Sequence, residues 1–154
     1  AEQQQAAASG LPQLMNGAHA VGVADGGAGL PIVGWSTTGG DLRVAHFVGL
    51  HALQVIPLCA LLLMRFSPAW LPAREQAQLT AIAGVAWIAL TLLLMWQALR
   101  GQPVIAPDDL MLVGLLVVTI GAAGLAALVL IRSRRMGVPH VDGRPVGEKR
   151  SIAW

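Results

Sequence analysis

Three long apolar runs constrain what this chain can fold into more than any other feature. Each run has 21 or 22 residues without Asp, Glu, Lys or Arg, and the runs cover 44–64, 79–99 and 110–131. A helix needs roughly 20 mostly apolar residues to cross a bilayer. Because hydrocarbon offers the backbone no hydrogen-bond partner, each spanning run must be helical. The runs therefore predict an all-α, polytopic transmembrane helical bundle with three spans.

The composition agrees with this prediction and excludes other classes of protein. The chain of 154 residues is 55 % hydrophobic and 12 % charged, whereas a soluble domain carries about 25 % charged residues. Such a composition excludes a disordered chain. The single cysteine, Cys59, excludes a disulfide-stapled fold. The net charge is only +2, and the charges occur in blocks between the apolar runs, so no nucleic-acid partner is expected.

The positions of the charges predict the orientation in the membrane. Loops rich in Lys and Arg stay in the cytoplasm. One side of the predicted bundle carries eight basic residues, and the other carries two basic and five acidic residues. The basic side comprises Arg65, Arg74, Arg132, Arg134, Arg135, Arg144, Lys149 and Arg150. The sequence thus divides into a glycine-rich extracytoplasmic segment (1–43), a transmembrane domain (44–131) and a basic cytoplasmic tail (132–154).

An extracytoplasmic N-terminal segment has a further consequence. Such a segment normally follows a cleaved signal peptide or an earlier spanning helix, and residues 1–16 contain no apolar run. We therefore expect an additional helix upstream, which would complete a four-helix bundle with both ends in the cytoplasm.

Polar side chains in and before the first run form the one candidate site. At 100° per residue, Arg43, His46, His51 and Gln54 share one broad helix face. Polar groups within a membrane are costly and frequently functional, so we expect this face to turn toward the bundle interior. Asp41 is placed to cap the helix. His19 and Asp41 belong to the glycine-rich segment that would lie above this face.

Three uses of these residues stay open. In the first, they hydrogen-bond the glycine-rich loop and hold it over the bundle, because buried polar groups need partners. In the second, His19, His46 and His51 ligate haem or a metal ion, although His46 and His51 lie about 140° apart around a helix. In the third, they bind a small polar ligand, a quinone or a proton. The absence of any cofactor is the default expectation.

The segment from Gly17 to Gln54 carries a run of short motifs: AHxVG, DGGxGLP, GWS and GDLRxxHFxGLHxxQ. It resembles the signature of an uncharacterised family of small bacterial integral membrane proteins with four helices. The resemblance covers about a quarter of the chain and implies no activity. It implies a location in the bacterial cytoplasmic membrane and a helix before the segment. The residues that match are His19, Asp25, Trp35, Asp41, Arg43, His46, His51 and Gln54.

From these observations we expect a non-catalytic membrane protein, a small structural or accessory subunit of a larger, energy-transducing membrane complex. Its expected partners are the lipid bilayer and other membrane-protein subunits. The alternatives are a haem- or metal-binding redox protein, or a protein with a quinone, proton or small-ligand site.

Overall fold

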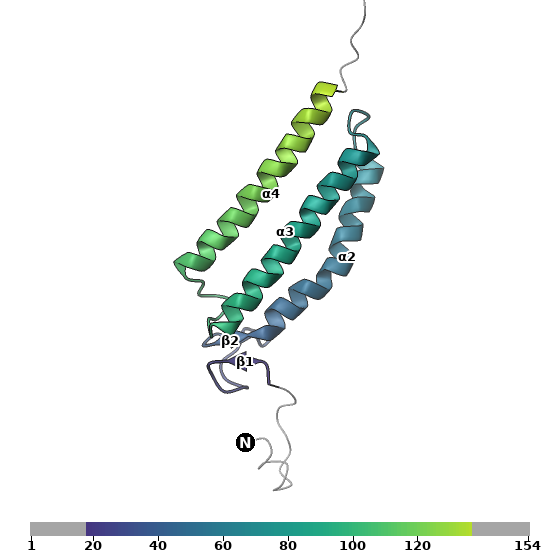
Figure 1. Ribbon diagram of the computed structural model, residues 1–154. Coiled ribbons are helices and arrows are strands. Elements are labelled where there is room, and N and C mark those ends of the chain that lie inside the picture. Colours follow the sequence, from purple (N-terminus) through teal and green to yellow (C-terminus); the bar gives the residue numbers. More distant parts are fainter. Residues whose placement is uncertain (1–17, 137–154) are drawn as a thin grey trace, which may run out of the picture.

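The computed structural model describes residues 18–136, which form three long helices and one short two-stranded sheet (Figure 1). All three helices are long and apolar enough to cross a membrane. This confirms the predicted all-helical class with three spans. In chain order the elements are β1 (Ala20–Val21), β2 (Gly40–Asp41), α2 (Leu42–Phe66), α3 (Ala73–Leu99) and α4 (Asp109–Met136).

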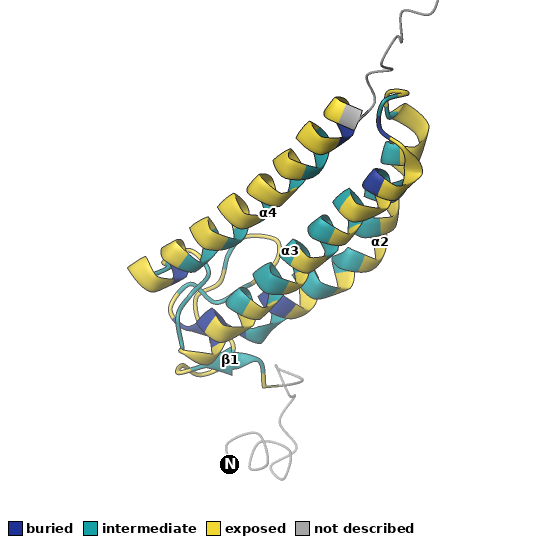
Figure 2. Cartoon of the chain, turned by 45° about the horizontal axis from the view of Figure 1, so that its top comes forward, coloured by how far each residue is buried: buried dark blue, intermediate teal, exposed yellow. Residues whose placement is uncertain are grey.

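The helix α3 lies between the other two and packs against both, whereas α2 and α4 have little contact with each other (Figure 1). The three spans thus form a layer with α3 at its centre. We call the end where α2 and α4 begin the loop end, and the end where they finish the tail end. Fully buried residues gather near these two ends, while the faces between them are largely exposed (Figure 2). Exposed apolar side chains of this kind suit contact with lipid or with other membrane helices.

Close packing of α2 on α3 depends on one small residue and one indole. A Cβ atom built on Gly49 would lie 3.2 Å from Cγ2 of Thr91, so glycine lets the two backbones approach. One turn away, Nε1 of Trp87 donates a hydrogen bond of 2.8 Å to the carbonyl oxygen of Val48. The indole therefore finds its partner on the neighbouring helix, as a buried Trp usually does.

At the tail end, α4 contacts the connection between α2 and α3. The Ser133 hydroxyl donates a hydrogen bond of 2.7 Å to the carbonyl oxygen of Trp70. The guanidinium carbon of Arg134 lies 4.7 Å from the centre of the Trp70 ring, close enough for a cation–π contact. Leu71, next in this connection, is buried. These contacts help to hold α4 in the layer, since along its length α4 packs against α3 and has little contact with α2.

The helices are longer than the apolar runs from which they were predicted. α3 begins at Ala73, before its apolar run, and α4 continues to Met136 beyond its own. Polar residues such as Arg74 and Arg135 extend the helices past the hydrocarbon, where apolarity no longer marks them. Residues 1–17, and most of the predicted tail at 137–154, lie outside the described residues.

Candidate functional site

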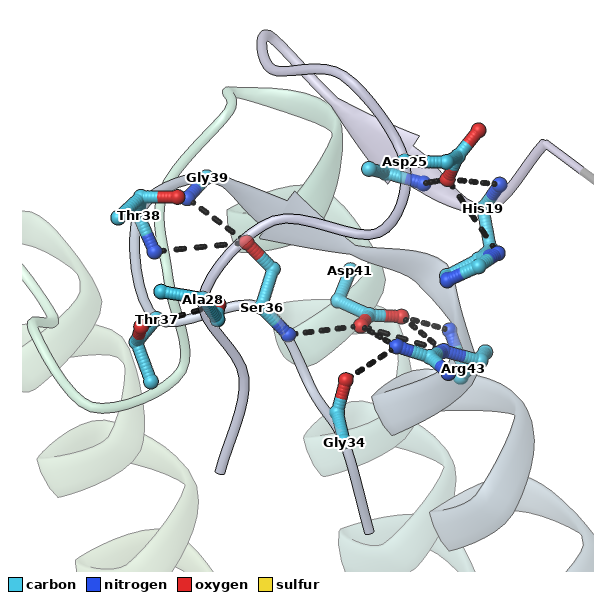
Figure 3. Close-up of polar contacts among 11 residues, drawn as sticks. His19, Asp25, Ala28, Gly34, Ser36, Thr37, Thr38, Gly39, Asp41 and Arg43 are labelled. Carbon is cyan, nitrogen blue, oxygen red and sulfur yellow. Dashed lines mark hydrogen bonds and ion pairs between the residues drawn. The ribbon is translucent and has the colours of Figure 1, made fainter. Parts of the chain in front are cut away.

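The glycine-rich segment folds back over the start of α2 and is fixed there by backbone and carboxylate hydrogen bonds (Figure 3). β1 and β2 pair antiparallel, with Ala20 opposite Asp41. The Leu42 amide, at the first residue of α2, donates a hydrogen bond of 3.0 Å to the carbonyl oxygen of His19. Residues distant in the sequence are thereby joined to the beginning of the first spanning helix.

Asp41 is the centre of this arrangement, and only 2 % of it is exposed. Its side chain caps α2, as predicted, by accepting a hydrogen bond of 3.0 Å from the Arg43 amide. It also accepts one of 2.9 Å from the Ser36 amide in the loop. The guanidinium of Arg43 pairs with the same carboxylate at 2.6 Å and donates to the carbonyl oxygen of Gly34 at 2.6 Å. We call Asp41, Arg43, Gly34 and Ser36 the loop clamp.

A second carboxylate, that of Asp25, holds the backbone at the start of β1. Oδ1 of Asp25 accepts hydrogen bonds from the backbone amides of His19, at 3.1 Å, and Ala20, at 2.8 Å. Nδ1 of His19 lies 3.3 Å from the same oxygen (Figure 3). Asp25 therefore holds β1 in place and orients the His19 ring toward Arg43. It was among the residues of the family-like signature, but its role as an acceptor for two amides could not be read from spacing.

Burial raises the pKa of Asp41, but the hydrogen bonds from Arg43 and Ser36 outweigh it and hold that pKa below 3.8. The backbone amides of Ala20 and His19 likewise hold the pKa of Asp25 below 3.8. A depressed carboxylate pKa contributes stability that is complete above the unfolded value and is lost as the pH falls through the folded value.

We therefore expect the loop to stay attached from pH 8 down to about 5, and to detach only below about pH 4. Near-ultraviolet circular dichroism of Trp35, which packs edge-on against Phe47 with ring centres 5.6 Å apart, reports the attachment. A Trp35→Phe variant identifies the part of the signal that belongs to this residue. Detachment between pH 7 and 5 would show that a group other than these carboxylates controls the loop.

The residue at the end of the loop, Gly40, must be glycine for a steric reason. A Cβ atom on Gly40 would lie 2.8 Å from the carbonyl carbon of Ala98 and 3.0 Å from its Cα, with the carbonyl oxygen closer still. The strand β2 therefore lies directly against the last turn of α3, and only glycine permits that approach. Through this contact the loop is joined to α3 as well as to α2.

A pocket of about 200 Å³ lies beneath the loop, between the glycine-rich segment and Arg43 at the start of α2. Its lining includes His19, Ser36 and Arg43, together with the backbone of Gly26, Gly27 and Gly34. Gly26 and Gly34 have φ angles of +84° and +63°, which side chains rarely adopt. The structure thus brings His19, Asp41 and Arg43 of the predicted site together.

The other three predicted site residues lie elsewhere. In the described chain their helix face does not turn toward α3: His46 and Gln54 are exposed, and His51 is half-buried. The reason is that α3 packs on the opposite face of α2, where Ala45 and Gly49 allow a closer approach than the polar face does. We call Arg43, His46, Phe47, Leu50, His51, Gln54, Leu58 and Leu61 the outward face of α2.

The His51 ring is held by its own helix. Nδ1 lies 2.7 Å from the carbonyl oxygen of Phe47, and the two ring centres are 4.0 Å apart. Since a carbonyl only accepts, Nδ1 is the donor of this hydrogen bond. Within residues 18–136, no three His, Cys, Asp or Glu side chains are grouped so that they could hold a metal ion. His19, His46 and His51 therefore do not converge as the metal hypothesis requires.

Two further polar contacts at the loop end were missed by the sequence analysis. Arg100 forms an ion pair with Asp108 across the turn between α3 and α4, and its guanidinium carbon lies 4.4 Å from the centre of the Trp96 ring. The Arg100 guanidinium lowers the pKa of Asp108 to about 2. Buried Gln97 donates a hydrogen bond of 2.9 Å to the carbonyl oxygen of Pro103. Opposite charges eight residues apart were the available signal for the ion pair.

No family model, curated protein or solved structure matches the chain.

Proposed function

We propose that the chain is a non-catalytic, multi-pass membrane protein that works as a small structural or accessory subunit of a larger membrane complex. The loop clamp holds the glycine-rich loop in place at the loop end of the protein. A neighbouring membrane helix packs against the outward face of α2. The observation that carries the proposal is the exposure of polar side chains on that face.

The depth of these side chains explains why their exposure matters. Gln54 is the thirteenth residue of α2, which places it about 18 Å along a helix that is about 37 Å long. It therefore lies near the middle of the hydrocarbon. An amide that faced lipid there would be without hydrogen-bond partners, at a cost of several kcal/mol. A neighbouring helix that covers the face removes this cost, which is why an assembled state is favoured over a solitary one.

The contacts inside the layer leave other surfaces available for assembly. Between α3 and α4 runs an open apolar groove of about 360 Å³, lined among others by Ala86, Ala89, Gly121 and Ala122. Small residues let membrane helices approach closely. The hydroxyls of Thr80, Thr91 and Thr119 donate to carbonyl oxygens of their own helices. These spans therefore offer packing surfaces and no convergent set of reactive groups along their length.

We further propose that the loop end is extracytoplasmic and the tail end cytoplasmic, in a bacterial cytoplasmic membrane. The support is the charge distribution: Arg65, Arg74, Arg132, Arg134 and Arg135 all lie at the tail end of the described residues. At the loop end, Arg43 and Arg100 are each paired with an aspartate. The tail end thus carries the unneutralised positive charge that the positive-inside rule assigns to the cytoplasm.

Purification of the full chain from its native membrane in a mild detergent tests the proposal. We expect a complex in which one or more other membrane proteins are present in fixed stoichiometry, with no Soret band and no stoichiometric metal. A protein that is always recovered without other proteins would contradict the subunit role. A Soret band or bound metal that is lost in a His51→Ala variant of unchanged thermal stability would establish the redox alternative instead.

The pocket beneath the loop favours a second candidate function, the binding of a small polar ligand. His19 and Arg43 supply hydrogen-bond donors to a space of about 200 Å³, which suits a carbonyl or carboxylate group of a small molecule. Mass spectrometry of small molecules released on denaturation tests this candidate. A compound present with the unaltered protein and absent from a His19→Ala variant would support it, and identical extracts from both would refute it.

A further inference from the structure

We propose that the tail end of the protein binds the headgroups of anionic phospholipids, whose phosphates neutralise its arginines and so hold the end of α4 against the connection between α2 and α3. The ligand is a phosphodiester whose headgroup carries no cation, as in phosphatidylglycerol. The inference depends on the three spans and not on the proposed subunit role, and it holds for either leaflet of the membrane.

The first argument is an excess of positive charge that the described residues do not neutralise. Five exposed arginines lie at the tail end, in the last turns of α2 and α4 and the first turn of α3: Arg65, Arg74, Arg132, Arg134 and Arg135. Among residues 18–136 the three ion pairs all lie at the loop end. The one carboxylate that these residues place at the tail end, that of Glu75, is buried. Like charges gathered at one end repel each other, so the tail end needs anions from outside the described chain.

The second argument is the source of those anions. Residues 137–154 contain two acidic and three basic residues, so the rest of the tail adds positive charge. The helices α2, α3 and α4 have 25, 27 and 28 residues and are about 37 to 42 Å long, whereas the hydrocarbon is about 30 Å thick. Their terminal turns therefore extend into the layer of lipid phosphates. These phosphates surround the helix ends whether or not the expected upstream helix packs against α2.

The third argument is the contact between Arg134 and Trp70, at the point where α4 meets the connection between α2 and α3. The guanidinium carbon of Arg134 lies 4.7 Å from the centre of the indole ring. A guanidinium stacked on an aromatic ring keeps its N–H groups at the edge of its plane, where two of them can donate to one phosphate. Within residues 18–136 Arg134 has no carboxylate partner. Trp70 therefore positions a guanidinium whose donors suit a phosphodiester.

The loop end contains the same arrangement with its anion present. The guanidinium carbon of Arg100 lies 4.4 Å from the centre of the Trp96 ring, and Asp108 is its counter-ion. A phosphodiester carries the same single negative charge as that carboxylate and likewise offers two acceptor oxygens. An ethanolamine headgroup would also bring an ammonium among the five arginines, whereas a glycerol headgroup would not. We therefore expect the tail end to prefer phosphatidylglycerol to phosphatidylethanolamine.

Native mass spectrometry tests the proposal with full-length protein that has been stripped of lipid in detergent. The protein is supplied with phosphatidylglycerol or phosphatidylethanolamine of the same acyl chains. We expect it to retain phosphatidylglycerol at least several-fold more. In circular dichroism, phosphatidylglycerol should raise the temperature of thermal unfolding, and phosphatidylethanolamine should not.

Variants of single arginines test the place of binding. Arg134→Gln should weaken phosphatidylglycerol binding roughly 5-fold, the factor for one cation near a membrane surface. Arg100→Gln is the matched control, because Arg100 is also stacked on a tryptophan but already has a counter-ion, so its loss should leave lipid binding unchanged. Arg135→Gln removes an exposed arginine of the same helix end while leaving the contact between Arg134 and Trp70 in place. It should weaken phosphatidylglycerol binding to a similar extent.

Equal retention of the two lipids would overturn the inference, as would phosphatidylglycerol binding that neither Arg134→Gln nor Arg135→Gln weakens. Inorganic phosphate that raised the unfolding temperature as much as phosphatidylglycerol does would also overturn it, because a soluble anion would then be the ligand. None of these results depends on whether other membrane proteins purify with the chain, so the subunit role is tested separately.

Discussion

Replacing Asp41 by alanine is expected to detach the glycine-rich loop and to destabilise the protein by about 2–4 kcal/mol. Loss of a helix cap costs about 0.5–2 kcal/mol, and breaking a buried ion pair costs 3–5 kcal/mol. The cost of breaking a buried ion pair applies only in part, because the Arg43 side chain is 40 % exposed and water can solvate it. The Ser36 amide, in contrast, loses its acceptor inside the loop.

Thermal unfolding in detergent, monitored by circular dichroism, measures the loss of stability, and limited proteolysis at the exposed loop residue Ile32 measures detachment. Asp109→Ala is the matched control, since Asp109 is an exposed aspartate in the first turn of α4, where its loss should cost less than about 1 kcal/mol. If Asp41→Ala left the loop as protected as Asp109→Ala does, the carboxylate would not be the group that holds it.

Replacing Gly40 by alanine is expected to change the arrangement of the loop end more than Asp41→Ala does. The added methyl group would collide with the backbone of Ala98, and not with a flexible side chain that could move aside. Overpacking of this kind costs typically 1–3 kcal/mol and sometimes more. We expect a loss at the upper end of that range, with β2 displaced from α3.

Gly84→Ala is the control for Gly40→Ala. Gly84 lies within α3, and a Cβ atom there would meet no other atom within 4 Å in the described chain. Alanine favours a helix over glycine by about 1 kcal/mol, so this variant should be neutral or slightly more stable. Two variants of equal stability would mean that β2 does not lie against α3 in solution.

The fold class could be predicted because it depends on one-dimensional information. The length of an apolar run fixes whether it can span a bilayer, and all three runs are helices that meet this requirement. The cap at Asp41 was also predictable, since it involves an amide two residues away. Both properties are local in the sequence.

The orientation of the polar face of α2 could not be predicted by the same reasoning. We expected His46 and Gln54 to turn inward, because polar groups avoid lipid. The decisive factor was the opposite face, where Gly49 allows α3 to come close. The contact of Gly40 with Ala98 was equally inaccessible, because it joins the loop to a helix end 58 residues later. Such contacts depend on which surfaces fit together, and a single sequence does not display that.

Labelling of single cysteines in intact cells tests most directly the central claim, that these helices cross a membrane with the loop end outside. In a Cys59→Ala background, Ile32→Cys lies in the exposed loop and Ala69→Cys in the exposed connection at the tail end. We predict that a membrane-impermeant maleimide labels Ile32→Cys in intact cells, and labels Ala69→Cys only after permeabilisation. Labelling of both in intact cells, or the reverse order, would contradict the account.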